Sequence, residues 1–307
     1  MYKLDYPMLL KIFKSTLIIT NKIFNSLYDS ETLDARNKLR IRILYIMKLR
    51  SETIFKILPQ SINANVSFDF PSVAILTRSL IEAYRVFYYL TSEANINDSE
   101  FELRYLIFEA YNIFEREKML KSMEAEELID EKPKIFEEEL QKLKFQIESN
   151  NFYKQIKSIS QENTKYKLLR DKALFSQGFK NELINFKGCF IKDKEVVLKR
   201  LIEKEPELQK SQTTIEYRYE YLYKLLSNYV HISAYSISEL PNYSYFKDEF
   251  YAEILKTILC TVFYLYVAIE DILNSFPQLR EYIGNQEDYS NIRVGIGVFI
   301  NFLKIPK

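Results

Sequence analysis

The chain contains little glycine, cysteine or histidine, and no tryptophan. Five glycines, two cysteines and one histidine occur among 307 residues. The first glycine is Gly178, so residues 1–177 lack the glycine-rich loops that cradle phosphate in Rossmann and P-loop domains. A single histidine also excludes the His-Glu-x-x-His zinc helix and the paired Glu-x-x-His motifs of di-iron bundles. We therefore predict no metal site and no cofactor.

The chain also lacks an excess of charge of one sign, because it has 43 basic and 42 acidic residues. A chain this close to neutral lacks the basic surface that generic DNA binding requires. Cys189 and Cys260 are too few for a disulfide framework, which favours a reducing, cytoplasmic location. The apolar run 258–269 is shorter than the about 20 residues of a membrane span. It predicts a buried core helix, and we expect no association with a membrane.

Apolar spacing and proline positions predict an all-α fold, a multi-helix bundle with long antiparallel helices. Asp5 and Asp69 have the positions of helix N-caps, and Ser99 with Glu102 has the spacing of a capping box. The third helix is apolar over most of its circumference, which predicts a central position. The expected helices cover approximately residues 5–28, 33–58, 71–90, 99–123, 134–149, 213–230 and 247–276.

The domain prediction is a single helical bundle over residues 1–283, followed by a C-terminal tail, 284–307. Weaker patterning over residues 150–212 indicates an irregular, insertion-like region, and a division into two lobes stays open. The sequence pattern leaves two alternatives for the structure of the tail. Alternating apolar residues at 292, 294, 296 and 298 are typical of a strand, whereas Phe299, Ile300 and Leu303 suit a helix. The sequence also does not decide whether the protein forms homo-oligomers.

A polar stripe crosses the third predicted helix. Arg78, Glu82, Arg85 and Tyr89 follow the spacing four, three, four, which places them on one helical face. In a functional interpretation, Glu82 between two arginines lines a polar pocket that binds an anion or transfers a proton. In a structural interpretation, the same charges form a network of side-chain pairs that fixes the helix register.

A second polar patch surrounds the only histidine. If residues 224–231 are helical, then Lys224, Ser227, Asn228 and His231 share one face. His231 would act as general acid or base and Lys224 would stabilise phosphate charge. The alternative is that His231 caps the helix C-terminus. Just upstream, Tyr221 lies in an alternation of aromatic and charged residues that either stacks on nucleic-acid bases or packs at an interface.

Two short segments carry a resemblance to a known family. Arg78-Ser79-Leu80-Ile81-Glu82, followed by Leu226-Ser227-Asn228-Tyr229-Val230-His231, resembles a bacterial family of helical proteins of unknown function. Its members pair an Arg-Ser-Leu-x-Glu helix with a later Leu-Ser-x-x-x-His segment. The resemblance implies a helical fold, a bacterial origin, and family positions at Arg78, Glu82, Ser227 and His231.

The second segment also resembles the HEPN ribonucleases of bacterial defence and toxin systems. These helical bundles carry an Arg-x(4 to 6)-His motif with an intervening polar residue. In this chain Lys224 stands at the outermost arginine position, and Asn228 is displaced by one from the usual polar position. The resemblance implies metal-independent RNA cleavage. Arg78 on the third helix would replace the missing guanidinium group if the two segments meet in space.

These features lead to a prediction of function. The leading hypothesis is a defence- or stress-associated RNase-like effector whose catalytic residues are His231, Glu82, Arg78 and Lys224. Arg85, Ser227, Asn228 and Tyr221 would contribute to binding. The alternative is a non-enzymatic module that binds a partner protein and uses these charges structurally. Sensing of a small anion at the two arginines is a third alternative.

Overall fold

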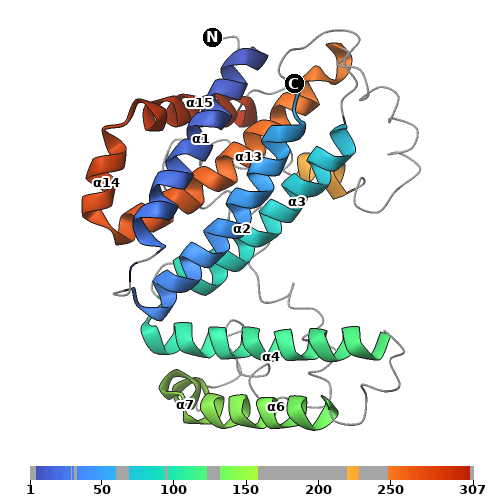
Figure 1. Ribbon diagram of the computed structural model, residues 1–307, viewed down its shortest axis with the longest axis vertical. Helices are drawn as coiled ribbons and strands as arrows, with labels where there is room; N and C mark the ends of the chain where they lie inside the picture. Colours follow the sequence, from blue (N-terminus) through green and yellow to red (C-terminus); the bar gives the residue numbers. More distant parts are fainter. Residues whose placement is uncertain are drawn as a thin grey trace. The chain divides into compact units, whose positions relative to one another are not determined.

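A computed structural model describes residues 5–28, 30, 33–59, 69–93, 96–122, 132–157, 220–227 and 248–304 (Figure 1). Helices make up 91% of the interpretable regions, and none of the described residues lies in a strand. The predicted all-α fold is therefore confirmed. The chain divides into two compact units, one of residues 1–88 with 192–307 and the other of residues 89–191.

The first unit is a bundle of helices. They are α1 (Tyr6–Leu27), α2 (Ala35–Ile57), α3 (Phe70–Phe87), α13 (Asp248–Ser275), α14 (Pro277–Gly284) and α15 (Glu287–Lys304). A further helical segment covers residues 220–227. Helices α1, α2, α3 and α13 lie close to their predicted positions, whereas α14 was not predicted. The contacts pair α2 with α3, α1 with α2 and α15, and α13 with α1, α2, α3 and α15 (Figure 1).

The centre of this unit is α13, whereas the sequence pattern predicted that the third helix is central. The run 258–269 is buried at every position, which confirms the predicted core helix. On α3, by contrast, the side of the helix that carries Ile75 is open, and Ile75 is 42% exposed. Within the described residues one helix, Ile254–Ser275, is long and apolar enough to span a membrane, and 94% of it is buried in the protein.

Two predicted N-caps are confirmed and one is wrong. Asp5 accepts a hydrogen bond from the Met8 amide at 2.9 Å, and Asp69 accepts one from the Ser72 amide at 3.1 Å. The helix predicted to start near Ser99 is capped by Asn97 instead, which accepts from the Glu100 amide at 2.8 Å. The Ser99 hydroxyl is used elsewhere, because it accepts a hydrogen bond from the Phe152 amide at 2.9 Å.

The tail forms a helix, so the strand alternative is wrong and the helical alternative is correct. Helix α15 packs closely on α1, because a Cβ built at Gly295 would lie 2.6 Å from Cγ2 of Ile12. Polar contacts strengthen this pairing, including a 2.7 Å hydrogen bond from Ser15 to Asp288. The tail is helical because it is buried against α1, and an alternation of only four residues is weak evidence for a strand.

The second unit contains α4 (Asp98–Ser122), α6 (Lys132–Ser149) and α7 (Asn151–Lys157). Helices α4 and α6 lie side by side (Figure 1). An ion pair of 2.9 Å joins Arg116 to Glu139. Asn150 ties the start of α7 to α4, because its amide nitrogen donates to the Ser99 carbonyl at 3.0 Å. Residues 150–157 of the predicted irregular region are thus ordered around α7, and the rest of that region, 158–212, lies outside the described residues.

Candidate functional site

The polar stripe on α3 forms a connected cluster of charges. Glu82 makes ion pairs with Arg78 one turn before it and with Arg85 one turn after it, the latter at 2.8 Å. The two arginine side chains are 13% and 10% exposed, whereas that of Glu82 is 40% exposed. The guanidinium groups are therefore held beneath a carboxylate that reaches the solvent.

Arg78 also contacts the helical segment 220–227, which is distant in sequence. Its Nη2 donates a hydrogen bond to the hydroxyl of Tyr223, 145 residues away, and its guanidinium carbon lies 4.1 Å from the centre of the Tyr223 ring. Stacking of arginine on an aromatic face is favourable and fixes the plane of the guanidinium group. We refer to Arg78, Glu82, Arg85 and Tyr223 as the α3 cluster.

A third arginine adds positive charge beside the α3 cluster. Nη1 of Arg50, on α2, donates to the backbone carbonyl of Ser79 at 2.7 Å, next to Arg78 in the chain. Burial lowers the pKa of Arg50 from its ordinary value. An arginine keeps its proton near neutral pH even so. Two guanidinium groups pair with the carboxylate of Glu82, so the α3 cluster itself carries one net positive charge, and Arg50 adds another on α2.

Arg78 carries one unused hydrogen-bonding group of the α3 cluster. Its Nη1 is buried and has no hydrogen-bond partner among the residues that the structure describes. A buried donor without an acceptor costs free energy, so an incoming oxygen atom that accepts this hydrogen bond would be favoured. An anionic oxygen that reaches this buried group would be bound, because Glu82 and Tyr223 hold Arg78 in position.

The second predicted patch is described only in part. Lys224 is 71% exposed and pairs with Glu220 at 2.9 Å, and the Ser227 hydroxyl donates to the Tyr223 carbonyl at 2.9 Å. Tyr221 is exposed. Asn228 and His231, both predicted as site residues, lie outside the described residues. The structure thus brings the segment that precedes His231 to α3 through Tyr223.

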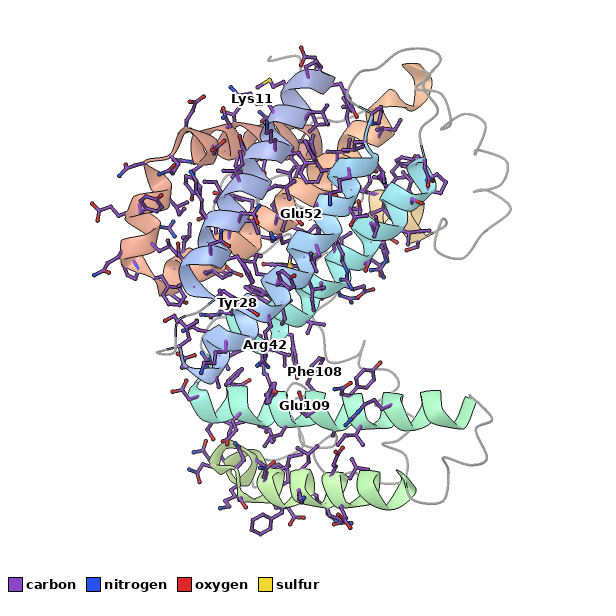
Figure 2. The ribbon with its side chains drawn as sticks, in the orientation of Figure 1. Lys11, Tyr28, Arg42, Glu52, Phe108 and Glu109 are labelled. Carbon is purple, nitrogen blue, oxygen red and sulfur yellow. The ribbon has the colours of Figure 1, made fainter. Side chains whose placement is uncertain are left out.

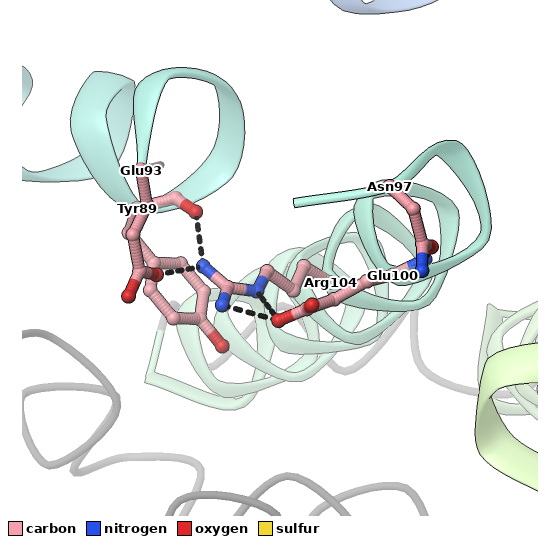
Figure 3. A network of polar contacts seen from close by, with 5 residues as sticks. All are labelled: Tyr89, Glu93, Asn97, Glu100 and Arg104. Carbon is pink, nitrogen blue, oxygen red and sulfur yellow. Dashed lines mark hydrogen bonds and ion pairs between the residues drawn. The ribbon is translucent and has the colours of Figure 1, made fainter. Parts of the chain in front are cut away.

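Tyr89, predicted to extend the stripe on α3, belongs instead to a separate network. Helix α3 ends at Phe87, and the π-helical turn η1 (Tyr88–Ser92) that follows it changes the register of the side chains. The Tyr89 carbonyl accepts a 2.6 Å hydrogen bond from Nη1 of Arg104, whose guanidinium carbon lies 4.4 Å from the Tyr89 ring centre (Figure 3). The Tyr89 carbonyl and ring therefore take part in the contacts of Arg104.

Arg104 is the centre of a buried polar network in the second unit. Its Nη1 lies 2.5 Å from Glu93, and its Nε donates to Glu100 at 3.1 Å (Figure 3). Burial tends to lower the pKa of Arg104, but Tyr89, Glu93 and Glu100 outweigh burial and raise the pKa above its ordinary value. We refer to Tyr89, Glu93, Glu100 and Arg104 as the Arg104 network. Its charged groups pair with one another, so we expect its role to be structural.

Sequence spacing could not identify Tyr223 as the contact of Arg78. The buried face of segment 220–227 is formed by Leu222, Leu225 and Leu226. On a helix, Tyr221 and Tyr223 lie about 100° to either side of Leu222, so the pattern does not choose between them. The sequence analysis also did not identify Arg50, because its hydrogen bond to the Ser79 carbonyl depends on the packing of α2 against α3.

Comparison of the chain with protein-family models, curated proteins and solved structures finds no match. Within the described ranges, no group of three or more histidine, cysteine, aspartate or glutamate side chains has an arrangement that could hold a metal ion.

Proposed function

We propose that this protein is a metal-independent ribonuclease of the HEPN type, acting as a cytoplasmic effector in bacterial defence or stress. The single observation that carries the proposal is the contact of Arg78 with Tyr223. It connects the charged cluster on α3 to helical segment 220–227, which precedes His231 in the chain. RNA is the proposed substrate, and the phosphodiester group is the proposed ligand of Arg78.

The chemistry assigns one role to each predicted residue. His231 accepts the proton of a ribose 2′-hydroxyl, whose oxygen attacks the adjacent phosphorus while the bond from phosphorus to the 5′-oxygen breaks. The leaving oxygen then takes a proton, and the products carry a 2′,3′-cyclic phosphate and a 5′-hydroxyl. Arg78 and Lys224 stabilise the charge that develops on phosphate, and Glu82 orients the guanidinium groups.

Replacing His231 with alanine is expected to lower the rate of RNA cleavage by about 10² to 10⁴, the usual contribution of a general acid or base. The measurement is gel analysis of several purified RNAs incubated with each variant in the presence of a chelator. Arg78→Ala is expected to slow cleavage as well. Arg42→Ala is the matched control, because Arg42 is an exposed arginine on α2 and its loss should leave the rate unchanged (Figure 2).

Two results would contradict the ribonuclease proposal. One is intact RNA after incubation with the wild-type protein at high concentration, across all RNAs tested. The other is equal cleavage by the wild type and by His231→Ala, which would assign the activity to a contaminating nuclease.

A second candidate function is a module that binds a partner protein. The observation in its favour is the exposure of large apolar side chains on α2, where Tyr45, Ile46 and Leu49 are 38%, 43% and 43% exposed. Apolar and aromatic side chains that remain exposed in this way are typical of protein interfaces. In this alternative Glu82 serves only to neutralise Arg78 and Arg85.

If Glu82 is structural, Glu82→Ala is expected to lower the free energy of unfolding by about 1 to 2 kcal/mol. This is less than the loss for a fully buried pair, since the Glu82 carboxylate is partly screened by solvent. The measurement is urea unfolding followed by circular dichroism. Glu52→Ala provides the control, because the ion pair of Glu52 is with Lys48 at 3.3 Å, whereas Glu82 pairs with two arginines, one of them at 2.8 Å. Equal stability of Glu82→Ala and wild type would contradict the structural role.

A further inference from the structure

A polar pocket lies in the first unit where α13, α14 and α15 meet. Its volume is about 540 Å³, and its lining includes Tyr266, Glu270, Arg280, Tyr289, Arg293 and Gly297. This volume falls within the roughly 300 to 1,000 Å³ of pockets that bind small molecules. None of the lining residues belongs to α3 or to segment 220–227, so the pocket is a different site from the α3 cluster.

The inner part of the pocket is a fixed hydrogen-bonded group around Glu270, which is 8% exposed. Tyr289 donates its hydroxyl proton to Oε1 of Glu270, and Nη2 of Arg280 donates to Oε2 at 3.2 Å. Burial, followed by the hydrogen bond to Glu270, raises the pKa of Tyr289 well above its ordinary value. The Tyr289 hydroxyl therefore stays a donor, and both carboxylate oxygens of Glu270 are used within the protein.

The charge of the lining selects the sign of a ligand. Arg280 and Arg293 supply two positive charges, and Glu270 supplies one negative charge that is already paired. One positive charge is therefore left over. Arg280 is also held in place by a 2.6 Å hydrogen bond to Asn274, so its guanidinium group is pre-oriented. Arg293 is exposed to solvent at the pocket, where an anionic group can reach it.

The rest of the lining provides room and apolar contact. Ile296 and Ile300 on α15 contribute aliphatic surface, and the Tyr266 ring contributes an aromatic one. A Cβ built at Gly297 or at Gly284 would have no atom within 4 Å, so both glycines leave open space beside the pocket. A ligand with an apolar body would bury that body here and direct its charge toward the arginines.

We propose that this pocket binds a small organic anion, a molecule in which a carboxylate or phosphate group is attached to a compact apolar body. The anionic group contacts Arg293 and Arg280, and the apolar body lies against Ile296, Ile300 and Tyr266. Glu270 holds Arg280 in the orientation that binds the anion, and Tyr289 holds Glu270.

The test is isothermal titration calorimetry of the full chain with phenyl phosphate and with benzoate, which separates the two anionic groups. Benzyl alcohol is the neutral comparison. We expect at least one anion to bind the wild type and benzyl alcohol to bind more weakly. Arg293→Gln removes a charge and Gly297→Leu fills the open space, and each is expected to weaken binding by about tenfold or more. Arg42→Gln, an exposed arginine on α2, should bind as the wild type does.

Folding of each variant is checked by thermal unfolding. Leucine has a higher helix propensity than glycine, so Gly297→Leu is expected to be at least as stable as the wild type. The proposal is overturned if neither anion binds at about 10 mM, or if benzyl alcohol binds equally well. It is also overturned if folded Arg293→Gln or folded Gly297→Leu binds the anion as tightly as the wild type. RNA cleavage is not part of this readout, so the outcome is independent of the proposed nuclease activity.

Discussion

Replacing Arg104 with methionine is expected to lower the free energy of unfolding by about 3 to 5 kcal/mol, as when one partner of a buried ion pair is removed. Arg104 is 1% exposed. Its removal leaves the carboxylates of Glu100 and Glu93 in a buried setting, where their side chains are 5% and 12% exposed. The Tyr89 carbonyl also loses a hydrogen-bond donor. The measurement is urea unfolding followed by far-ultraviolet circular dichroism, because the chain has no tryptophan to report by fluorescence.

A combined variant separates the cost of unpaired charge from the cost of lost packing. Arg104→Met together with Glu93→Gln and Glu100→Gln removes every formal charge of the Arg104 network. This triple variant is expected to be more stable than Arg104→Met alone, because neutral amides are less costly to bury than carboxylates. Stability of Arg104→Met within about 0.5 kcal/mol of the wild type would contradict the structural role of the network.

Replacing Phe263 with alanine is expected to cost a similar amount, about 3 to 5 kcal/mol, as for other fully buried aromatic residues. Phe263 is 2% exposed on α13, and its ring centre lies 5.2 Å from that of Phe299 on α15. The substitution would leave a cavity between the two helices. The same circular dichroism measurement of urea unfolding detects the loss.

Phe145→Ala is the matched control for this substitution. Phe145 lies on α6 and is 72% exposed, so truncation of its ring removes little buried area. Its stability is expected to stay within about 0.5 kcal/mol of the wild type. A comparable loss in both phenylalanine variants would show that burial in α13 is not the source of the effect.

The helices were predictable from sequence because their signals are local. Asp5 and Asp69 bind amides within the first turn of their own helices, and Pro7 and Pro71 lie at first-turn positions that tolerate proline. The central position of α13 was harder to predict, because an apolar circumference is a property of both α3 and α13. Only the packing of α13 against α1, α2, α3 and α15 distinguishes the two.

The candidate site was predictable only where it lies within one helix. Arg78, Glu82 and Arg85 meet because they are one turn apart, and this spacing is visible in the sequence. Tyr89 has equivalent spacing, but its ring and carbonyl contact Arg104 on α4, and a contact with another helix is not visible in the spacing. Partners from other helices, Tyr223 and Arg50, depend on tertiary packing and could not be derived from spacing.

The pairing of α1 with α15 has a consequence for synthesis of the protein. Ser15 and Asp288, which are hydrogen-bonded, are 273 residues apart in the chain. At translation rates of about 5 to 20 residues per second, α1 leaves the ribosome on the order of tens of seconds before α15 exists. Helices α4, α6 and α7 can form their mutual contacts during that interval. The face of α1 that packs on α15 stays uncovered until α15 has been synthesised. The nascent chain therefore presents a surface that chaperones bind and that favours aggregation during synthesis.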